Sequence, residues 1–447
     1  MFKTLKNAWK TPELQKKMIF TLFIVLLYRL GACIIVPYVD GNISTLFQQQ
    51  YGDSIFGLLG VLSGGAMQTA TLFALSVSPY ITASIVIQLL TIAIPALERM
   101  AKDGANGQKK INTITRFLTV GLAVVTSFGY SLILKNGNGS QSWLIPSIGT
   151  EKGVPEWFAL LVINACFCAG ASLVMWLAEL INEKGIGNGI SVILCVNIIA
   201  SFPSFFTTLL NGITNGTWWV GAIVAVAVAI VAVAAIGFII FVTNSERRIP
   251  IQYAKRVVGR KMYGGQSTHL PIKVNMSGVL PVIFAQAIAS IPATIGMFVP
   301  AAQTEGTGWY NFLKAFDSTS LIYCIIYGLL IVMFSYFYNT IQFNPVEVSN
   351  NLKKNGGFVP GFRPGKPTGD FLQKVTSRIT LFGALYLAVI ALLPAITGNI
   401  MKAFGSSAGS GLAIGGTSVI IVVGVALETV KTLEAQMMMR HYKGFLD

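Results

Sequence analysis

Basic side chains with aromatic neighbours are concentrated in two stretches of this sequence. Residues 245–275, SERRIPIQYAKRVVGRKMYGGQSTHLPIKVN, hold seven Lys and Arg among Tyr, Ile and Val. The second stretch, NGGFVPGFRPGKPTGD at 355–370, carries Arg363 and Lys366. Such surfaces suit anionic lipid, nucleic acid such as ribosomal RNA, or an acidic protein face. The alternative is that the charges only orient the chain in a membrane, but fewer would suffice, so docking is favoured.

Side chains that catalyse reactions or bind metals are sparse. His269 and His441 are the only histidines and lie 172 residues apart, which makes a His-based metal site improbable. Five cysteines lie inside apolar runs at spacings that match no zinc pattern: Cys33, Cys166, Cys168, Cys195 and Cys324. No Walker A pattern occurs in the sequence. We therefore expect neither an enzyme nor a cofactor.

The composition is that of a membrane protein, because 53% of the 447 residues are hydrophobic and 11% are charged. Ten apolar runs approach the roughly 20 residues that span a bilayer. They are 18–36, 71–95, 112–134, 156–181, 188–209, 218–243, 276–299, 320–343, 372–396 and 411–433. The sequence thus predicts an all-α, polytopic protein.

The placement of the basic residues predicts the orientation of these spans. With ten spans, 25 of the 32 Lys and Arg fall on the side of the two termini, four on the other side, and three within spans. Positive residues favour the cytosolic side. We expect cytosolic segments at 1–17 and 434–447 and cytosolic loops at 245–275 and 344–371. Glycine and proline in 355–370 predict neither helix nor strand through the middle of that loop.

Matching interruptions indicate two halves, 18–209 and 210–433. The second and seventh spans each have an early proline, Pro79 and Pro281, followed by a glutamine, Gln88 and Gln286. The fifth and tenth spans both follow glycine-rich stretches. An offset of five favours an inverted 5 + 5 repeat; ordinary helix kinks are the alternative. Residues 55–66, IFGLLGVLSGGA, are too short to cross and predict a re-entrant half-helix or an interfacial helix.

Several long stretches resemble the SecY family of protein-export channels. These are LFALSVSPYITASIVIQLL, NEKGIGNGIS, ERRIPIQYAKRVVGRKMYGGQSTHLPIKVNMSGVLPVIFAQ, GGFVPGFRPGKPT and GGTSVIIVV. The resemblance covers essentially the whole chain. It implies ten helices in two pseudo-twofold halves around a central pore, closed by a plug helix. It also implies a channel that translocates unfolded preproteins and releases transmembrane segments sideways into the bacterial cytoplasmic membrane. A secondary transporter of a small solute is the alternative.

The resemblance further implies roles for individual residues. An aliphatic pore ring falls on Val77, Ile81, Ile190, Leu194, Ile283 and Ile421. The plug falls on Ile55, Phe56, Leu58, Leu59, Val61 and Leu62. Polar residues at the lateral gate, which lies between spans two and three and spans seven and eight, are Gln88, Arg116 and Asn275.

The two basic loops would dock the ribosome or the SecA motor. The residues expected to do so are Arg247, Arg248, Lys255, Arg256, Arg260, Lys261, Phe358, Phe362, Arg363 and Lys366. The other partners implied are the SecE and SecG subunits, signal peptides and nascent chains, and membrane lipid. Because the chain has no ATP site of its own, its partners would supply the energy.

Overall fold

A computed structural model describes most of the chain. The described residues are 8–40, 43–44, 47, 60, 63–136, 143–145, 154–214, 218–253, 256–258, 261–263, 267–296, 320–403 and 416–443. Each of the ten predicted spans coincides with a helix or a closely spaced pair of helices within these ranges.

The first half of the chain supplies five spanning helices and one short helix, α6, that turns away from α5. They are α2 (Pro12–Gly31), α5 (Ser78–Ala93), α6 (Pro95–Lys102), α7 (Ala105–Asn136), α8 (Glu156–Lys184) and α9 (Gly189–Thr214). The second half supplies α10 (Trp218–Asn244), α11 (Leu280–Ala289), α12 (Ile291–Gly296), α14 (Leu321–Gln342), α15 (Pro345–Lys354), α16 (Lys366–Ala403) and α17 (Gly416–Lys443).

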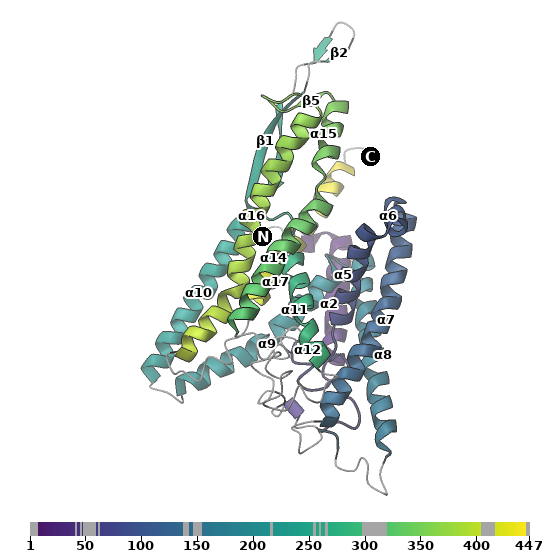
Figure 1. Ribbon diagram of the computed structural model, residues 1–447, viewed down its shortest axis with the longest axis vertical. Coiled ribbons are helices and arrows are strands. Elements are labelled where there is room, and N and C mark those ends of the chain that lie inside the picture. Colours follow the sequence, from purple (N-terminus) through teal and green to yellow (C-terminus); the bar gives the residue numbers. More distant parts are fainter. Residues whose placement is uncertain are drawn as a thin grey trace.

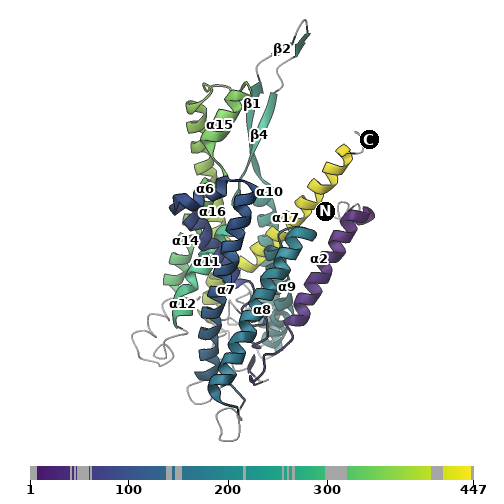
Figure 2. The same cartoon turned by 90° about the vertical axis from the view of Figure 1, so that its right-hand side faces the viewer.

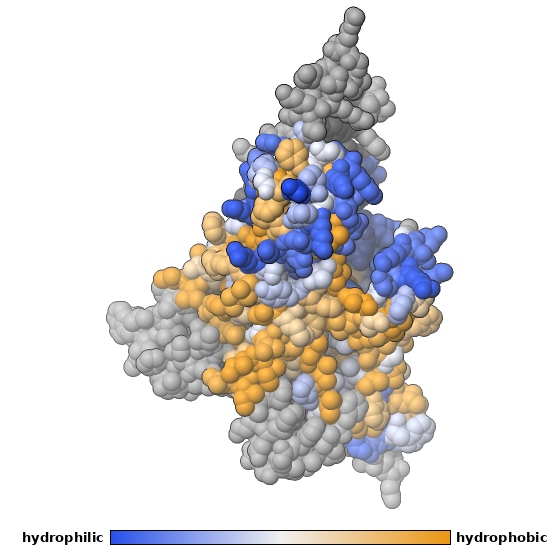
Figure 3. Space-filling view, turned by 45° about the horizontal axis from the view of Figure 1, so that its top comes forward, coloured by the Kyte–Doolittle hydropathy of each residue, from blue (hydrophilic) through white to orange (hydrophobic). Residues whose placement is uncertain are grey.

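Four of the described helical stretches are each long and apolar enough to cross a membrane: Asn106–Lys135, Glu156–Lys184, Leu321–Lys354 and Lys366–Leu393. Shorter apolar helices include Leu280–Gly296. Large apolar side chains on α2, α7, α8 and α14 are exposed. Figure 3 shows this apolar surface as a band over the helices, with hydrophilic residues gathered toward one end. This distribution is that of a protein embedded in a bilayer.

The second span differs from its predicted range of 71–95. Residues 63–77 form turns, and α5 begins only at Ser78, with Pro79 in its first turn. At the other end Ile94 is extended because it precedes Pro95, and α6 leaves α5 at an angle of 102°. The seventh span is likewise broken, since α11 ends at Ala289 and α12 begins two residues later.

The helices pack as two groups with a shared interface (Figures 1 and 2). In the first group α8 contacts α2, α7 and α9, and α7 contacts α5. In the second group α16 contacts α14 and α17, and α14 contacts α11. The groups meet where α9 packs on α10 and α17, and where α5 packs on α11.

A small β-sheet stands at one end of the helices, which we call the basic end (Figure 1). Its strands are β1 (Glu246–Tyr253), β4 (Ser267–Lys273) and β5 (Gly357–Phe358), in the order β4-β1-β5. All pairs are antiparallel. A second hairpin, β2 (Arg256–Val258) and β3 (Lys261–Tyr263), extends beyond it. The start of α2 and the end of α17 lie toward this same end (Figure 2).

The apolar face of the sheet covers the beginning of α16. Ile249, Ile272, Val359 and Leu372 are buried together there, with aromatic residues of α14 and α16 around them. Alternation along β1 produces this face, because Ile249 and Ile251 point inward while their neighbours are exposed. The two basic loops therefore fold into one unit on the helices.

Candidate pore constriction and docking surface

The six residues predicted to form a ring lie in one hydrophobic cluster. Val77, Leu194 and Ile421 are buried in it, and Ile81, Ile190 and Ile283 are half-buried against it. They come from four helices, α5, α9, α11 and α17, with Val77 at the N-terminal cap of α5. The cluster thus lies where the two groups of helices meet.

Local sequence explains how these side chains converge. Ile190 and Leu194 are four residues apart on α9 and so share one face. Glycine lets α17 approach α11 closely, because a Cβ on Gly424 would lie 2.4 Å from Cγ2 of Val279. This contact brings Ile421, one turn before Gly424, next to the start of α11, which carries Ile283.

Two cavities meet at this cluster. The larger, of about 500 Å³, extends from it toward the basic end between α9, α11 and α17. The smaller, of about 40 Å³, is lined by residues of α5, α9, α11 and α17. Ile283 and Ile421 line both cavities. The aliphatic side chains of Ile283 and Ile421 therefore form a partition between the two cavities.

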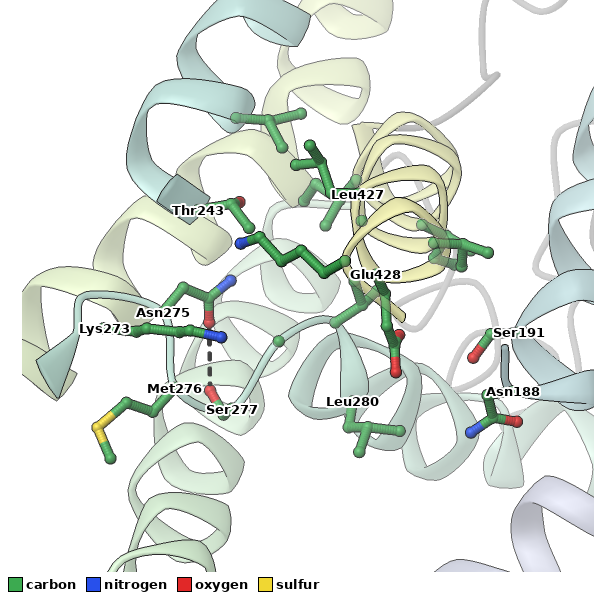
Figure 4. A pocket seen from close by; sticks show the side chains of 18 of the residues that line it. Asn188, Ser191, Thr243, Lys273, Asn275, Met276, Ser277, Leu280, Leu427 and Glu428 are labelled. Atoms are coloured by element: carbon green, nitrogen blue, oxygen red, sulfur yellow. Dashed lines mark hydrogen bonds between the residues drawn. The ribbon is translucent and has the colours of Figure 1, made fainter. Parts of the chain in front are cut away.

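The lining of the larger cavity is mixed, with polar and charged side chains among apolar ones. Asn188 and Ser191 lie on one side, Lys273 and Asn275 on the other, and Glu428 between them (Figure 4). The cavity ends at the aliphatic side chains of Ile283 and Ile421. An apolar constriction of this kind resists ions by dewetting when it is narrow.

The smaller cavity brings four polar side chains together at the seam between α5 and α11, a grouping that the sequence analysis missed. Ser78 and Thr82 of α5 face Gln286 and Ser290 of α11 across it. The hydroxyls of Thr82 and Ser290 also bond to backbone carbonyls of their own helices, at 3.1 and 2.7 Å. The signal was present, because each helix repeats its polar residues at a spacing of four.

The three residues predicted for the lateral gate are placed differently from that expectation. Arg116 pairs with Glu179 of α8, with Nε and Oε1 2.7 Å apart, so its ionic contact lies within the first group of helices. Gln88 bonds to Ser84 of its own helix at 3.5 Å. Asn275 is buried at the start of the α11 region, where it accepts a hydrogen bond from Ser277 at 3.5 Å. None of these three contacts joins α5 or α7 to α11 or α14 in the part of the chain that is described.

The six residues predicted for the plug, at 55, 56, 58, 59, 61 and 62, lie outside the described residues. Of the neighbouring described residues, Gly60 is helical, and the residues from Ser63 onward form turns that lead into α5. Gly64 has a φ of 66° and lies against the backbone of Asn197 in α9. Beside it, Asn197 donates to Ser76 Oγ at 3.0 Å, and Tyr28 Oη lies 3.4 Å from the same oxygen.

The predicted docking residues gather on the sheet and on the turn after β5. Arg247 and Arg248 are exposed on β1, where Arg248 Nε lies 2.7 Å from Glu246 Oε1. Arg256 is the first residue of β2, and Lys261 is the first residue of β3. Lys255 and Arg260 lie outside the described residues. The structure thus brings the two loops, distant in sequence, to one surface.

The turn after β5 holds the remaining docking residues. Phe358 is half-buried in β5, Arg363 is exposed, and Lys366 opens α16. Phe362 stacks on Phe371, with ring centroids 4.2 Å apart. Residues 360–365 form turns, as predicted for the middle of this loop.

Electrostatic and metal-binding features elsewhere are modest. Within α6, hydrogen bonding to Lys102, 2.6 Å away, lowers the pKa of the exposed Glu98 carboxyl. Among the residues that the structure describes, no group of His, Cys, Asp and Glu is arranged to hold a metal ion.

Together, the apolar band, the two groups of helices and the aliphatic partition at their interface define a polytopic membrane protein with a channel-like path. A sequence profile of the SecY family matches residues 71–430. The chain belongs to the SecY family.

The similar proteins include relatives that match over their full length. The protein translocase subunit SecY of Streptomyces coelicolor is 43% identical over 451 residues, covering 100% of both chains. That of Mycobacterium tuberculosis is 42% identical over 449 residues, covering 98% of both.

Solved structures match the fold. A protein-conducting channel has a TM-score of 0.62 at 18% identity, covering 95% of this chain and 92% of the other. Sec61 in a canine ribosome–channel complex has the same TM-score, identity and coverage. These likenesses confirm the predicted architecture of ten helices in two halves around a central path.

Proposed function

We propose that this chain is the channel subunit of a protein translocase, which conducts unfolded preproteins across the cytoplasmic membrane. The observation that carries the proposal is the partition of aliphatic side chains between two cavities at the interface of the halves. Aliphatic side chains contact a varied polypeptide without binding any one sequence. Full-length identity to SecY translocase subunits supports the same function.

We also propose that the channel opens sideways to release apolar segments into lipid. The contact between α5 and α11 supports this proposal, because polar side chains from both helices interrupt its apolar packing. Each hydrogen bond across or along such a seam contributes only about 0.5–1.5 kcal/mol net. An apolar signal segment of roughly 7–15 residues can offset a few such interactions by entering lipid.

The basic end is proposed to face the cytosol and to dock the partners that drive transport. Both termini, the β-sheet unit and the loop after β5 would then be cytosolic, in agreement with the charge asymmetry. The partners proposed are the SecA motor or the ribosome at this surface, and SecE and SecG within the membrane. Canine Sec61, a solved structure with the same fold, is in complex with a ribosome.

The first test is co-purification followed by reconstitution. The chain is purified from membranes, its bound subunits are identified, and the complex is placed in vesicles with a signal-bearing precursor and motor. Motor-dependent and signal-dependent protection of the precursor from protease is expected. A saturable flux of a small solute, without precursor passage, would instead support a secondary carrier. A precursor lacking its signal segment is the matched control.

A further inference from the structure

The hydroxyl of Tyr130 joins two parts of the first half that are far apart in sequence. Tyr130 lies on α7 and is fully buried, and its hydroxyl donates a hydrogen bond to the backbone carbonyl of Met67, 63 residues earlier. Its ring is held by Phe167 of α8, with centroids 5.2 Å apart. The Met67 carbonyl also accepts from the Ala70 N–H at 3.4 Å, so loss of the Tyr130 hydroxyl removes one of its two hydrogen bonds and destabilises this contact.

From Met67 the hydrogen bonds continue toward the predicted plug. The Met67 N–H donates to Ser63 Oγ at 3.1 Å, and that hydroxyl donates to the Gly60 carbonyl at 2.9 Å. The Gly65 N–H donates to the same Gly60 carbonyl at 2.9 Å. Ser63 and Met67 are both buried. Tyr130 is therefore the α7 end of a chain of hydrogen bonds that reaches Gly60.

The opposite side of this segment rests on other helices of the same half. A Cβ on Gly64 would lie 3.1 Å from Arg29 Nη1 of α2 and 3.1 Å from Asn197 Cα of α9. The segment 63–77 is thus held between α7 on one side and α2 and α9 on the other. A movement of α7 alone would change the contacts on one side of the segment and leave those with α2 and α9 in place.

The segment itself is held in an unfavourable backbone conformation. Ala70 and Ser76 have φ values of 46° and 48°, which residues with a Cβ rarely adopt. Such conformations persist only while surrounding contacts enforce them. Because Val77 of the aliphatic cluster follows directly, any relaxation here reaches the constriction.

We propose that Tyr130 is a positioning residue that ties α7 to the segment 63–77, so that movement of α7, which packs on α5, withdraws this segment and loosens the constriction. The proposal rests on the proposed channel function. This coupling needs no ligand, because the hydrogen bond from Tyr130 to Met67 transfers a displacement of α7 to the segment that precedes α5.

The first experiment measures the link without any transport assay. Hydrogen–deuterium exchange is followed for peptides covering 63–77 in the purified full-length complex in lipid discs. Tyr130→Phe removes only the hydroxyl and should raise the opening equilibrium of this segment about two- to tenfold, the range of one net hydrogen bond. The matched control is Tyr327→Phe on α14, since Tyr327 is as deeply buried and its hydroxyl has no hydrogen-bond partner among the described residues. Unchanged exchange in Tyr130→Phe, or an equal rise in the control, overturns the proposal.

The second experiment tests the coupling to the constriction. Ser63→Ala cuts the same chain at its other end, so the Tyr130→Phe, Ser63→Ala double variant should exchange little faster than either single variant. Fully additive effects overturn a single connected chain. Tyr130→Phe should also raise the resting ion leak of vesicles and the export of precursors with weakened signal segments. Faster exchange with a wild-type leak and unchanged export overturns the coupling. Failure of the wild-type complex to pass any precursor would count against the proposed function, while the exchange comparison would still decide the hydrogen-bond link.

Discussion

Phe358 pairs with Gln252 in an antiparallel register, and this pairing joins the two basic loops of the chain into a single sheet. The neighbouring pair, Tyr253 with Gly357, is tightly packed, because a Cβ on Gly357 would lie 2.9 Å from the Tyr253 ring. A partner that binds either loop therefore acts on both. The first two predictions follow from this shared unit.

Arg363→Glu should weaken motor-driven transport much more than its single charge suggests. The side chain is exposed, and its backbone is held independently by a hydrogen bond from Thr368 Oγ1 to the Arg363 carbonyl at 2.7 Å. Losing one member of a buried interfacial charge pair costs about 2–5 kcal/mol, so binding should fall at least about tenfold. The measurement is precursor transport at limiting motor concentration.

Lys366→Glu is the matched control for this charge reversal. Lys366 is the first residue of α16, where an acidic side chain is favourable for the helix. We expect a smaller effect than for Arg363→Glu. Near-normal transport by an Arg363→Glu complex that still contains its partner subunits would contradict a docking role for Arg363.

Leu372→Ala should loosen both basic loops together. Leu372 lies on α16 and is fully buried against the sheet. Truncating a buried leucine to alanine costs about 2–5 kcal/mol. Limited proteolysis in 245–275 and in 355–365 should accelerate in parallel. Val346→Ala, at an exposed position of α15, should leave both rates unchanged. Faster cleavage of only one loop would show that the sheet does not couple them.

Ile283→Asn and Ile421→Asn should each make resting vesicles leak ions. Both side chains line both cavities, so a polar group at either position rehydrates the partition. The measurement is single-channel conductance in the absence of precursor. Ile283→Leu retains the aliphatic bulk and should stay sealed. Equal conductance in the Asn and Leu variants would remove the support for a ring at this position.

The predicted orientation can be tested by labelling single cysteines. In a background whose five native cysteines are replaced, cysteines at 262 and 360 should react only from the cytosolic side. Cysteines at 45 and 305 should react only from the outside. The reason is the excess of Lys and Arg on the side of the termini. If 262 and 305 were labelled from the same side, the ten-span arrangement would be wrong.

The sequence predicted the helices well where hydropathy alone decides the structure. The run 156–181 became α8, Glu156–Lys184, because a bilayer span must satisfy its backbone internally. It predicted the start of α5 poorly. Residues 71–77 are as apolar as a span, but they pack as turns against α8, where a Cβ on Gly170 would lie 1.9 Å from the Leu72 carbonyl oxygen.

Contacts between distant segments were beyond the sequence analysis. The short strand β5 pairs with β1, and its glycine-rich sequence has no strand signal of its own. Arg116 was expected at the seam, but it pairs with Glu179 of α8. This partner depends on how α7 is rotated toward α8. The family resemblance identified the six aliphatic residues, and helix packing explains why they meet.

The thinness of the aliphatic partition has an electrical consequence. Because Ile283 and Ile421 each line both cavities, about one layer of side chains separates the two cavities. When water from the two sides of the membrane fills both cavities, nearly all of the membrane voltage falls across that layer, instead of across the roughly 30 Å of the hydrocarbon core. A charged residue of a passing chain would gain or lose about 2.3 kcal/mol per 100 mV within one short step. Acidic and basic residues would thus experience opposite forces at a single point of the path. The membrane potential would favour movement in one direction for acidic residues and in the other direction for basic residues.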